Sequence, residues 1–206
     1  MNTRALGNKP ILQSWNDLLN PTYRGMVGYL DPTSAAVGQV GVVAVNLALG
    51  GTYENFDPAM GFFRRLRDNQ PIVPRQTAYA RVLSGEIPIL LDYDFNAYRA
   101  QYSDGAPTRF VIPAEGTQVL PYVMGLVANG TNPDNGRRML DFLLSDEGQR
   151  RWAGAFLRPV SSELMPESAA ARFLPAIDYA RAAPLDVRRL AGAVRMLAER
   201  YHREVG

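Results

Sequence analysis

The chain has 206 residues, of which 47% are hydrophobic and 20% are charged. This length and composition suit one large or two small folded domains and argue against disorder. Cysteine is absent, which excludes disulfides, thiolate zinc sites, iron–sulfur clusters and thiol nucleophiles. The charge balance, 22 Lys and Arg against 20 Asp and Glu, is nearly neutral and gives little support to nucleic-acid binding.

No run of apolar residues is long enough to cross a membrane. The most apolar stretch, 35–49, is interrupted by glycine, glutamine and asparagine. Residues 1–10 lack the apolar core of a secretory signal. We therefore expect no membrane span, and a cytoplasmic location if the chain is translated as given.

Strand and helix patterns alternate in the first part of the chain, which favours an α/β architecture with crossover connections. The strand candidates are 25–30, 87–91, 109–112 and 121–127, and the helix candidates are 14–19, 35–49, 57–69 and 77–84. From Asn132 onward the pattern is helical, with N-caps at Asn132 and Ser145 and a last helix that opens at Pro184. The arginines of that last helix lie off its apolar face, so we expect them to be solvated.

Residues suited to catalysis are scarce. The single histidine, His202, lies almost at the end of the last helix, where it would be a poor base for a Ser-His-Asp relay. The sequence also lacks the glycine-rich and serine motifs of common nucleotide-binding proteins and hydrolases. We expect no enzyme activity, no cofactor and no bound metal.

The most informative candidate for binding is the turn between strand 25–30 and helix 35–49. Small side chains at Ser34, Ala35 and Ala36 lead into the amino end of the helix. Free backbone N–H groups and the positive end of the helix dipole make such a place suitable for an oxyanion. An equally good interpretation is that Thr33 or Ser34 simply caps the helix.

A second candidate follows the apolar strand 87–91. Asp92, Tyr93 and Asp94 come directly after it, and ligands of open α/β sheets bind beyond the carboxyl ends of strands. The alternative is that they are solvent-facing turn residues. Glu115 is a third candidate, in a segment between two strand candidates that could cross between domains.

Six short strings occur in order along the chain. They are SWNDLLNPTYRG at 14–25, DPTS at 31–34, SGEIP at 84–88, PAEGT at 113–117, LLSDEGQ at 143–149 and RPV at 158–160. Together they resemble the extracellular solute-binding proteins of ABC importers, in the branch that includes ferric-ion, thiamine, polyamine, phosphonate and sugar-phosphate binders. The resemblance implies a type II periplasmic-binding-protein fold, whose two α/β lobes close around a small solute. It also implies a periplasmic location and an ABC permease as partner.

The same resemblance divides the chain into lobes. Residues 12–113 would form an almost complete lobe two, and 118–206 would be the C-terminal, mostly helical part of lobe one. Residues 1–11 would be a remnant after the first crossing strand, and the first third of the family's chain would be absent. The helices of 118–206 would then lack strands to cover, so we expect exposed apolar surface and either self-association or a truncated gene product.

The resemblance also bears on the solute. The ferric branch has two adjacent tyrosines where this chain has Phe95 and Asn96, which disfavours iron. An anion turn facing two aspartates across a cleft suits an aminophosphonate or a sugar phosphate, with a polyamine as the alternative. Asn69 and Gln76 could add amide hydrogen bonds.

Two other functions fit the same sequence. The effector domain of a transcription regulator shares this fold and has about this length. A truncated fragment that binds no ligand is the other alternative.

Overall fold

The computed structural model describes residues 1–206. They form two compact units. The first, called the main unit, consists of residues 1–120 and 175–206, and the second, the helical unit, consists of residues 121–174. The chain therefore leaves the main unit once and returns to it.

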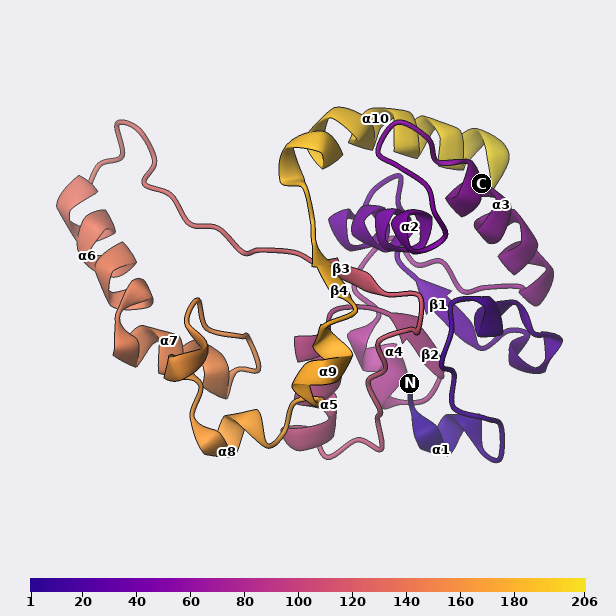
Figure 1. The fold of residues 1–206 in the computed structure, drawn as a ribbon, viewed down its shortest axis with the longest axis horizontal. Helices are drawn as coiled ribbons and strands as arrows, with labels where there is room; N and C mark the ends of the chain where they lie inside the picture. The colour runs from indigo at the N-terminus through magenta and orange to yellow at the C-terminus, as the bar shows by residue number, and fades with distance from the viewer. The chain divides into compact units, whose positions relative to one another are not determined.

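A small, largely parallel sheet lies at the centre of the main unit (Figure 1). Strand β1 (Val27–Tyr29) pairs in parallel with β2 (Ile89–Leu91), so that Val27 lies opposite Ile89. On the other side of β1, Gly28 forms a parallel bridge with Ile72. Beyond β2, Asn2 donates to the Pro88 carbonyl over 2.7 Å and forms an antiparallel bridge with Thr108. The predicted α/β class is confirmed.

Helices surround this sheet and connect its strands. In the main unit they are α1 (Thr3–Leu6), η1 (Asn16–Leu19), η2 (Pro21–Tyr23), α2 (Ala36–Ala48), α3 (Asp57–Leu66), η3 (Arg67–Asn69), α4 (Tyr79–Leu83), α5 (Asp94–Tyr102), α9 (Ala176–Tyr179) and α10 (Val187–Glu204). None of the helices combines the length and the apolar character that a bilayer crossing needs.

The core of the main unit forms where α2, α3 and α10 meet the sheet. Phe63 of α3 is fully buried. Its ring centroid lies 5.0 Å from that of Tyr29 and 5.9 Å from that of Tyr201. Apolar residues at helical spacing place one face of each helix in this core, and the burial of large aromatic side chains is a main source of its stability.

A second parallel pair joins the two ends of the excursion into the helical unit. Strand β3 (Thr117–Val119) pairs with β4 (Ala182–Pro184), and Thr117 lies opposite Ala182. Residues 175–206 therefore pack with residues 1–120. The predicted lobes, 12–113 and 118–206, instead group residues 175–206 with residues 121–174. The identity of the ligand-binding lobes stays a prediction.

The helical unit consists of α6 (Pro133–Leu144), α7 (Asp146–Gly154), η4 (Ser162–Leu164) and α8 (Glu167–Ala170). The Ser145 side chain caps α7 by accepting the Gly148 N–H. Helix α6 buries none of its residues. Large apolar side chains are exposed in this unit, namely Tyr122, Val123, Met124, Leu126, Val127, Met139, Phe142, Leu144 and Val160. The expected exposed apolar surface is therefore present.

Several predicted elements differ from the observed ones. Residues 109–112 and 121–127 are not strands. Arg109 exchanges backbone hydrogen bonds with Met1, but this pairing does not continue along 110–112. The helix predicted at 14–19 is only the 3-10 turn η1, since Asn20 and Pro21 end it and begin η2. The helix predicted at 77–84 shortens to α4.

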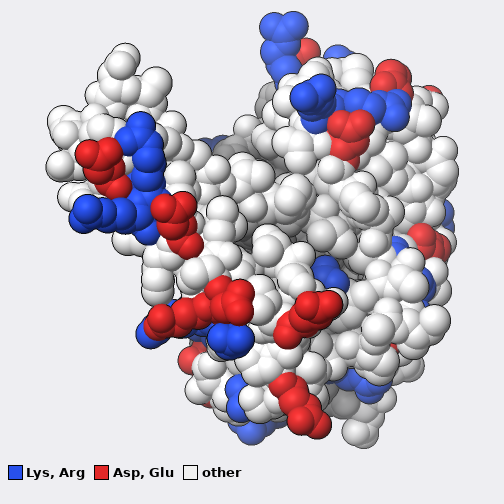
Figure 2. All heavy atoms as spheres, turned by 60° about the vertical axis from the view of Figure 1, so that its left-hand side comes forward, with Lys and Arg blue, Asp and Glu red and all other residues white.

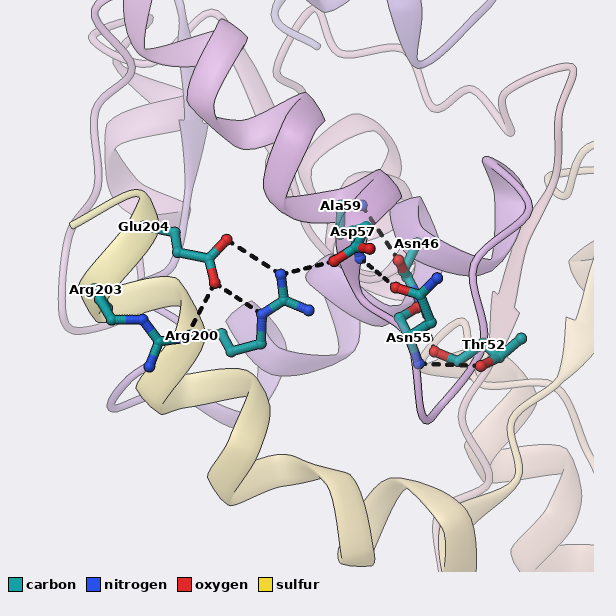
Figure 3. A network of polar contacts seen from close by, with 8 residues as sticks. All are labelled: Asn46, Thr52, Asn55, Asp57, Ala59, Arg200, Arg203 and Glu204. Atoms are coloured by element: carbon teal, nitrogen blue, oxygen red, sulfur yellow. Dashed lines mark hydrogen bonds and ion pairs between the residues drawn. The ribbon is translucent and has the colours of Figure 1, made fainter.

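A buried asparagine fixes the loop between α2 and α3. Asn46 is completely buried, and its amide donates to the Thr52 and Asn55 carbonyls over 2.8 and 2.9 Å. Its Oδ1 atom accepts the Ala59 N–H (Figure 3). A fully hydrogen-bonded buried amide holds this loop in one conformation.

Beside this loop, ion pairs connect α10 to α3. Arg200 donates to both carboxylate oxygens of Glu204 and, over 2.9 Å, to Asp57 (Figure 3). Arg203 donates to Glu204 as well. Hydrogen bonding from Arg200 is the main reason why the pKa of Glu204 falls from 4.5 to about 2.

The close approach of α2 to the end of β1 can be tested at Gly38. A Cβ atom at this position would lie 2.2 Å from the Leu30 carbonyl oxygen. We expect Gly38→Ala to destabilise the protein by about 1–3 kcal/mol, because the helix must shift away from the strand. Gly41→Ala, in the same helix with open space around it, should stabilise by about 0.5–1 kcal/mol. Urea unfolding measures both, and equal effects would contradict the close-packing argument.

The Glu204 pair predicts a pH-dependent contribution to stability. Because the folded-state pKa is lowered, the contribution is present above about 4.5 and is lost as the pH falls toward 2. We expect Glu204→Gln to lower the free energy of unfolding at pH 7 and to have no effect near pH 2. Glu199→Gln is the control, since Glu199 forms only an exposed pair with Arg195 at 3.9 Å. A Glu204→Gln effect that persisted at low pH would show that the ion pair is not its cause.

Candidate functional site

The carboxyl ends of three parallel segments meet at one edge of the main sheet. Tyr29, the last residue of β1, lies opposite Leu91, the last residue of β2, and the segment after Ile72 runs parallel to both. The residues that follow the three segments are 30–36, 92–94 and 75–76. The pairing therefore brings two predicted site segments and Gln76 to the same edge.

The turn after β1 is held by its own aspartate. Asp31 Oδ1 accepts hydrogen bonds from the Thr33 backbone N–H and hydroxyl over 2.8 and 2.7 Å. The Asp31 carbonyl accepts the N–H groups of Ser34 and Ala35. These four bonds fix the backbone that leads into α2.

The amino end of α2 has no side-chain cap. Its N-cap residue is Ala35, and no side chain accepts a hydrogen bond from the first turn. The interpretation of Thr33 or Ser34 as the helix cap is therefore wrong. Ser34 and Ala36 are exposed, and the first N–H groups of a helix have no acceptor within it. The turn can offer backbone donors and a positive helix end to an anion.

Asp92 lies at the end of β2, half-buried. Its Oδ1 accepts the Tyr93 N–H over 2.8 Å, and its Oδ2 accepts the Asn96 amide over 3.0 Å. Burial raises the pKa of Asp92 in spite of these two bonds. The ionised form of Asp92 is therefore incompletely stabilised by the protein, and a cationic group of a ligand would stabilise it.

Asp94 begins α5 and is oriented by a residue from far along the chain. Its Oδ1 accepts the Phe95 N–H over 2.9 Å, and its Oδ2 accepts the hydroxyl of Tyr179 in α9 over 3.2 Å. The Tyr179 oxygen lies 2.7 Å from the hydroxyl of Tyr98. The rings of Tyr93 and Phe95 stack at 5.3 Å. No local sequence signal points to Tyr179, which lies 85 residues from Asp94.

The turn 34–36 and the aspartates do not lie on opposite walls of a cleft, as the sequence suggests. They follow neighbouring strands of one sheet, and such strands are only about 4.8 Å apart. Both segments therefore belong to one wall.

Asn69 does not lie at this edge. Its carbonyl accepts the Gly25 N–H, before β1 begins, and its buried amide donates to the Leu18 and Asn20 carbonyls over 2.8 and 2.9 Å. Asn69 is therefore a structural residue that joins η3 to η1. Gln76 is exposed and follows the outer strand segment, at the edge that the aspartates share.

Glu115 holds the start of η1. It accepts hydrogen bonds from the Ser14 hydroxyl and, over 3.2 Å, from the Trp15 N–H, and the Trp15 indole donates to the Gly116 carbonyl. Partial burial opposes ionisation of Glu115, but the hydrogen bond from Ser14 and nearby backbone N–H groups outweigh it and lower the pKa. These contacts assign Glu115 a structural role.

Charge is not concentrated on the face shown in Figure 2, where Lys and Arg alternate with Asp and Glu. The structure has no group of three or more His, Asp or Glu side chains arranged to hold a metal ion. The charges at the edge itself come from the amino end of α2, from Asp31, Asp92 and Asp94, and from Arg75, which lies 3.9 Å from Asp31.

Comparison with known proteins identifies the family. A family model described as bacterial extracellular solute-binding protein matches residues 1–183. The chain belongs to this family. An uncharacterised protein of Haemophilus influenzae is 30% identical over 146 residues, which cover 70% of this chain and 40% of the relative.

Two further similarities are informative. A Salmonella typhi protein with the provisional name of a 2-aminoethylphosphonate-binding periplasmic protein is 28% identical over 173 residues, which cover 80% of this chain and 49% of the relative. The periplasmic binding protein AfuA from Actinobacillus pleuropneumoniae, solved with exogenous fructose-6-phosphate bound, superposes with a TM-score of 0.70 at 20% identity, over 98% of this chain and 62% of that one.

These comparisons confirm the type II periplasmic-binding-protein fold. The chain spans about half the length, or less, of the two curated relatives from Haemophilus influenzae and Salmonella typhi.

The environment of Asp92 yields a prediction that needs no ligand. Because burial raises its pKa, the ionised carboxylate opposes folding, and this cost disappears as the pH falls through the folded-state pKa. We expect Asp92→Asn to leave the melting temperature unchanged or higher at pH 7, with the difference from the wild type shrinking in acid. Asp92→Ala, which removes both hydrogen bonds, should lower it. Equal losses in the two variants would contradict this account.

Proposed function

We propose that the chain forms part of the solute-binding protein of an ABC importer and that the carboxyl edge of the main sheet binds a small anion of the phosphonate or sugar-phosphate class. The observation that carries the proposal is the uncapped amino end of α2, exposed beside Asp92 and Asp94. In this proposal the protein works in the periplasm and delivers its solute to an ABC permease.

The anionic end of the solute would bind at the turn 34–36. Backbone N–H groups and the helix dipole there favour a phosphonate or phosphate. Small side chains at Ser34 and Ala36 leave room for its three oxygens. The provisional name of the Salmonella typhi relative and the sugar phosphate bound to AfuA support this solute class.

The other end of the solute would face the two aspartates. Asp92 and Asp94 can each accept a hydrogen bond from an ammonium or hydroxyl group. The raised pKa of Asp92 favours a ligand that carries a positive group, because that group would stabilise its ionised form. The ligand class that fits both ends is an aminophosphonate or a sugar phosphate.

The alternatives fit less well. A polyamine has no anionic group and would leave the positive end of α2 unused. Ferric ion would need a set of anionic oxygen donors, and Tyr98, the second tyrosine near the edge, is buried with its hydroxyl bonded to Tyr179. The family match does not favour a transcription regulator.

A charge placed on the helix end tests the proposal. We expect wild-type protein to bind 2-aminoethylphosphonate or fructose 6-phosphate in calorimetry, and Ala36→Asp to weaken that binding about tenfold or more, because its carboxylate would occupy the anion position. Ala36→Asn, of similar size but neutral, should bind nearly as well as the wild type. The acidic variant should fold normally, since a carboxylate in the first turn favours the helix.

Other results would change the conclusion. Heat with spermidine and none with the phosphate-bearing compounds would reverse the order of the solutes. No heat and no thermal stabilisation with any solute would favour the fragment that binds no ligand. Equal affinities of Ala36→Asp and wild type would place the anion elsewhere.

A further inference from the structure

A hollow of about 510 Å³ lies on the flank of the main unit, where the outer strand segment passes the end of α10. Its lining includes Tyr29, Asp31, Arg67, Val73, Tyr201 and His202. None of the predicted site residues lines it, but Asp31, Thr33 and Arg75 from the carboxyl edge do, so the hollow adjoins the turn at 34–36. We call it the flank pocket.

A buried tyrosine pair in the lining has an unused hydrogen-bond donor. The hydroxyl oxygens of Tyr29 and Tyr201 lie 2.6 Å apart, and the two residues are only 3% and 5% exposed. Two hydroxyls carry two hydrogens, but their mutual bond uses only one. The second hydrogen has no acceptor within the protein. Because an unpaired buried donor is costly, this position favours a ligand with an acceptor oxygen.

Two arginines and one aspartate line the same pocket. Arg67 is exposed and forms no ion pair with an acidic side chain. Arg75, also in the lining, has only a long contact of 3.9 Å with Asp31. Asp31, the acidic side chain of the lining, accepts two hydrogen bonds from Thr33 through its Oδ1, and its Oδ2 has only the 3.9 Å contact with Arg75. The Arg67 guanidinium forms no ion pair and lies in the same pocket as the unused hydroxyl.

The outer strand segment adds backbone donors. The Ile72 N–H donates to the Val27 carbonyl, and the Ile72 carbonyl accepts the Tyr29 N–H. The Pro74 carbonyl accepts the Asp31 N–H. Both residues therefore direct their hydrogen-bonding groups toward β1. Alternate residues of a strand point in opposite hydrogen-bonding directions, so the N–H of Val73 is directed away from β1. Val73 lines the flank pocket, where its N–H has no acceptor in the protein.

We propose that the flank pocket, which adjoins the turn at 34–36, is a second binding site for a tetrahedral oxyanion such as phosphate. Arg67 would supply the charge, and the tyrosine hydroxyl and the Val73 N–H would supply the buried and backbone donors. The bound group could be free inorganic phosphate or the phosphate of a larger molecule, since both present the same oxygens. One molecule could then bind its solute at the edge of the sheet and an oxyanion in the flank pocket at the same time.

The single histidine of the chain makes this proposal directly testable. His202 lines the flank pocket, so its imidazole proton resonances report on this pocket. We expect inorganic phosphate at constant pH and ionic strength to shift them in a saturable way. Arg67→Gln should weaken that response about tenfold, because a charge-assisted hydrogen bond is lost. Arg64→Gln is the matched control, since Arg64 is an exposed arginine of the neighbouring helix α3 that does not line the pocket.

Further variants separate this site from the solute site. Asp92→Asn, which changes the solute site at a residue that does not line the flank pocket, should leave the His202 response unchanged, so that a failure of either proposal can be told from a failure of the other. Tyr201→Phe should weaken phosphate binding while the folded fraction, followed by circular dichroism, stays high. Glucose 6-phosphate tests whether a phosphate on a larger molecule also enters. No saturable shift with the wild type, or the same affinity in Arg67→Gln, would overturn the proposal.

Discussion

The parallel pairing of β1 with β2 is the constraint on which the rest of the site depends. It involves only three residues in each strand, yet its register fixes where both strands end. Because the strands run in the same direction, the turn into α2 and the aspartates before α5 emerge at one edge. An antiparallel pair would have placed them at opposite ends of the sheet. Two segments about 60 residues apart in the chain thus form one surface through a short hydrogen-bonded ladder.

The position of α2 depends on this ladder and on Gly38. The buried glycine lets the first turn of the helix contact the Leu30 carbonyl, so the helix end stays beside the end of β1. At its other end, α2 is fixed by the buried Asn46 amide. A helix fixed at both ends cannot rotate its uncapped N–H groups away from the edge, which is the preorganisation that an anion site needs.

Local signals in the sequence predict much of the fold but little of its long-range arrangement. Strand β1 and helices α2, α3 and α10 are predictable because their apolar periodicity and breakers lie within the segments themselves. The strands predicted at 109–112 and 121–127 are wrong, because strand formation needs a partner that composition does not reveal.

The candidate site shows the same limit. The uncapped turn at 34–36 and the aspartates can be found from their positions after strands, but their place on one wall depends on strand order. Asn69 resembles a ligand-binding amide because nothing in the sequence shows that the Leu18 and Asn20 carbonyls occupy its donors. Tyr179 escapes prediction because it reaches Asp94 only through the return of the chain from the helical unit.

Two carboxylates near the ends of strands show how their environments separate structural from binding roles. Glu115 accepts hydrogen bonds from Ser14 and Trp15, and its pKa is lowered although burial opposes this. Its charge is already stabilised by the protein, so a ligand could add little. Asp92 also accepts two hydrogen bonds, yet burial keeps its pKa raised. A positive group of a ligand would gain more at Asp92 than at Glu115, because only Asp92 has an ionised form that the protein leaves under-stabilised.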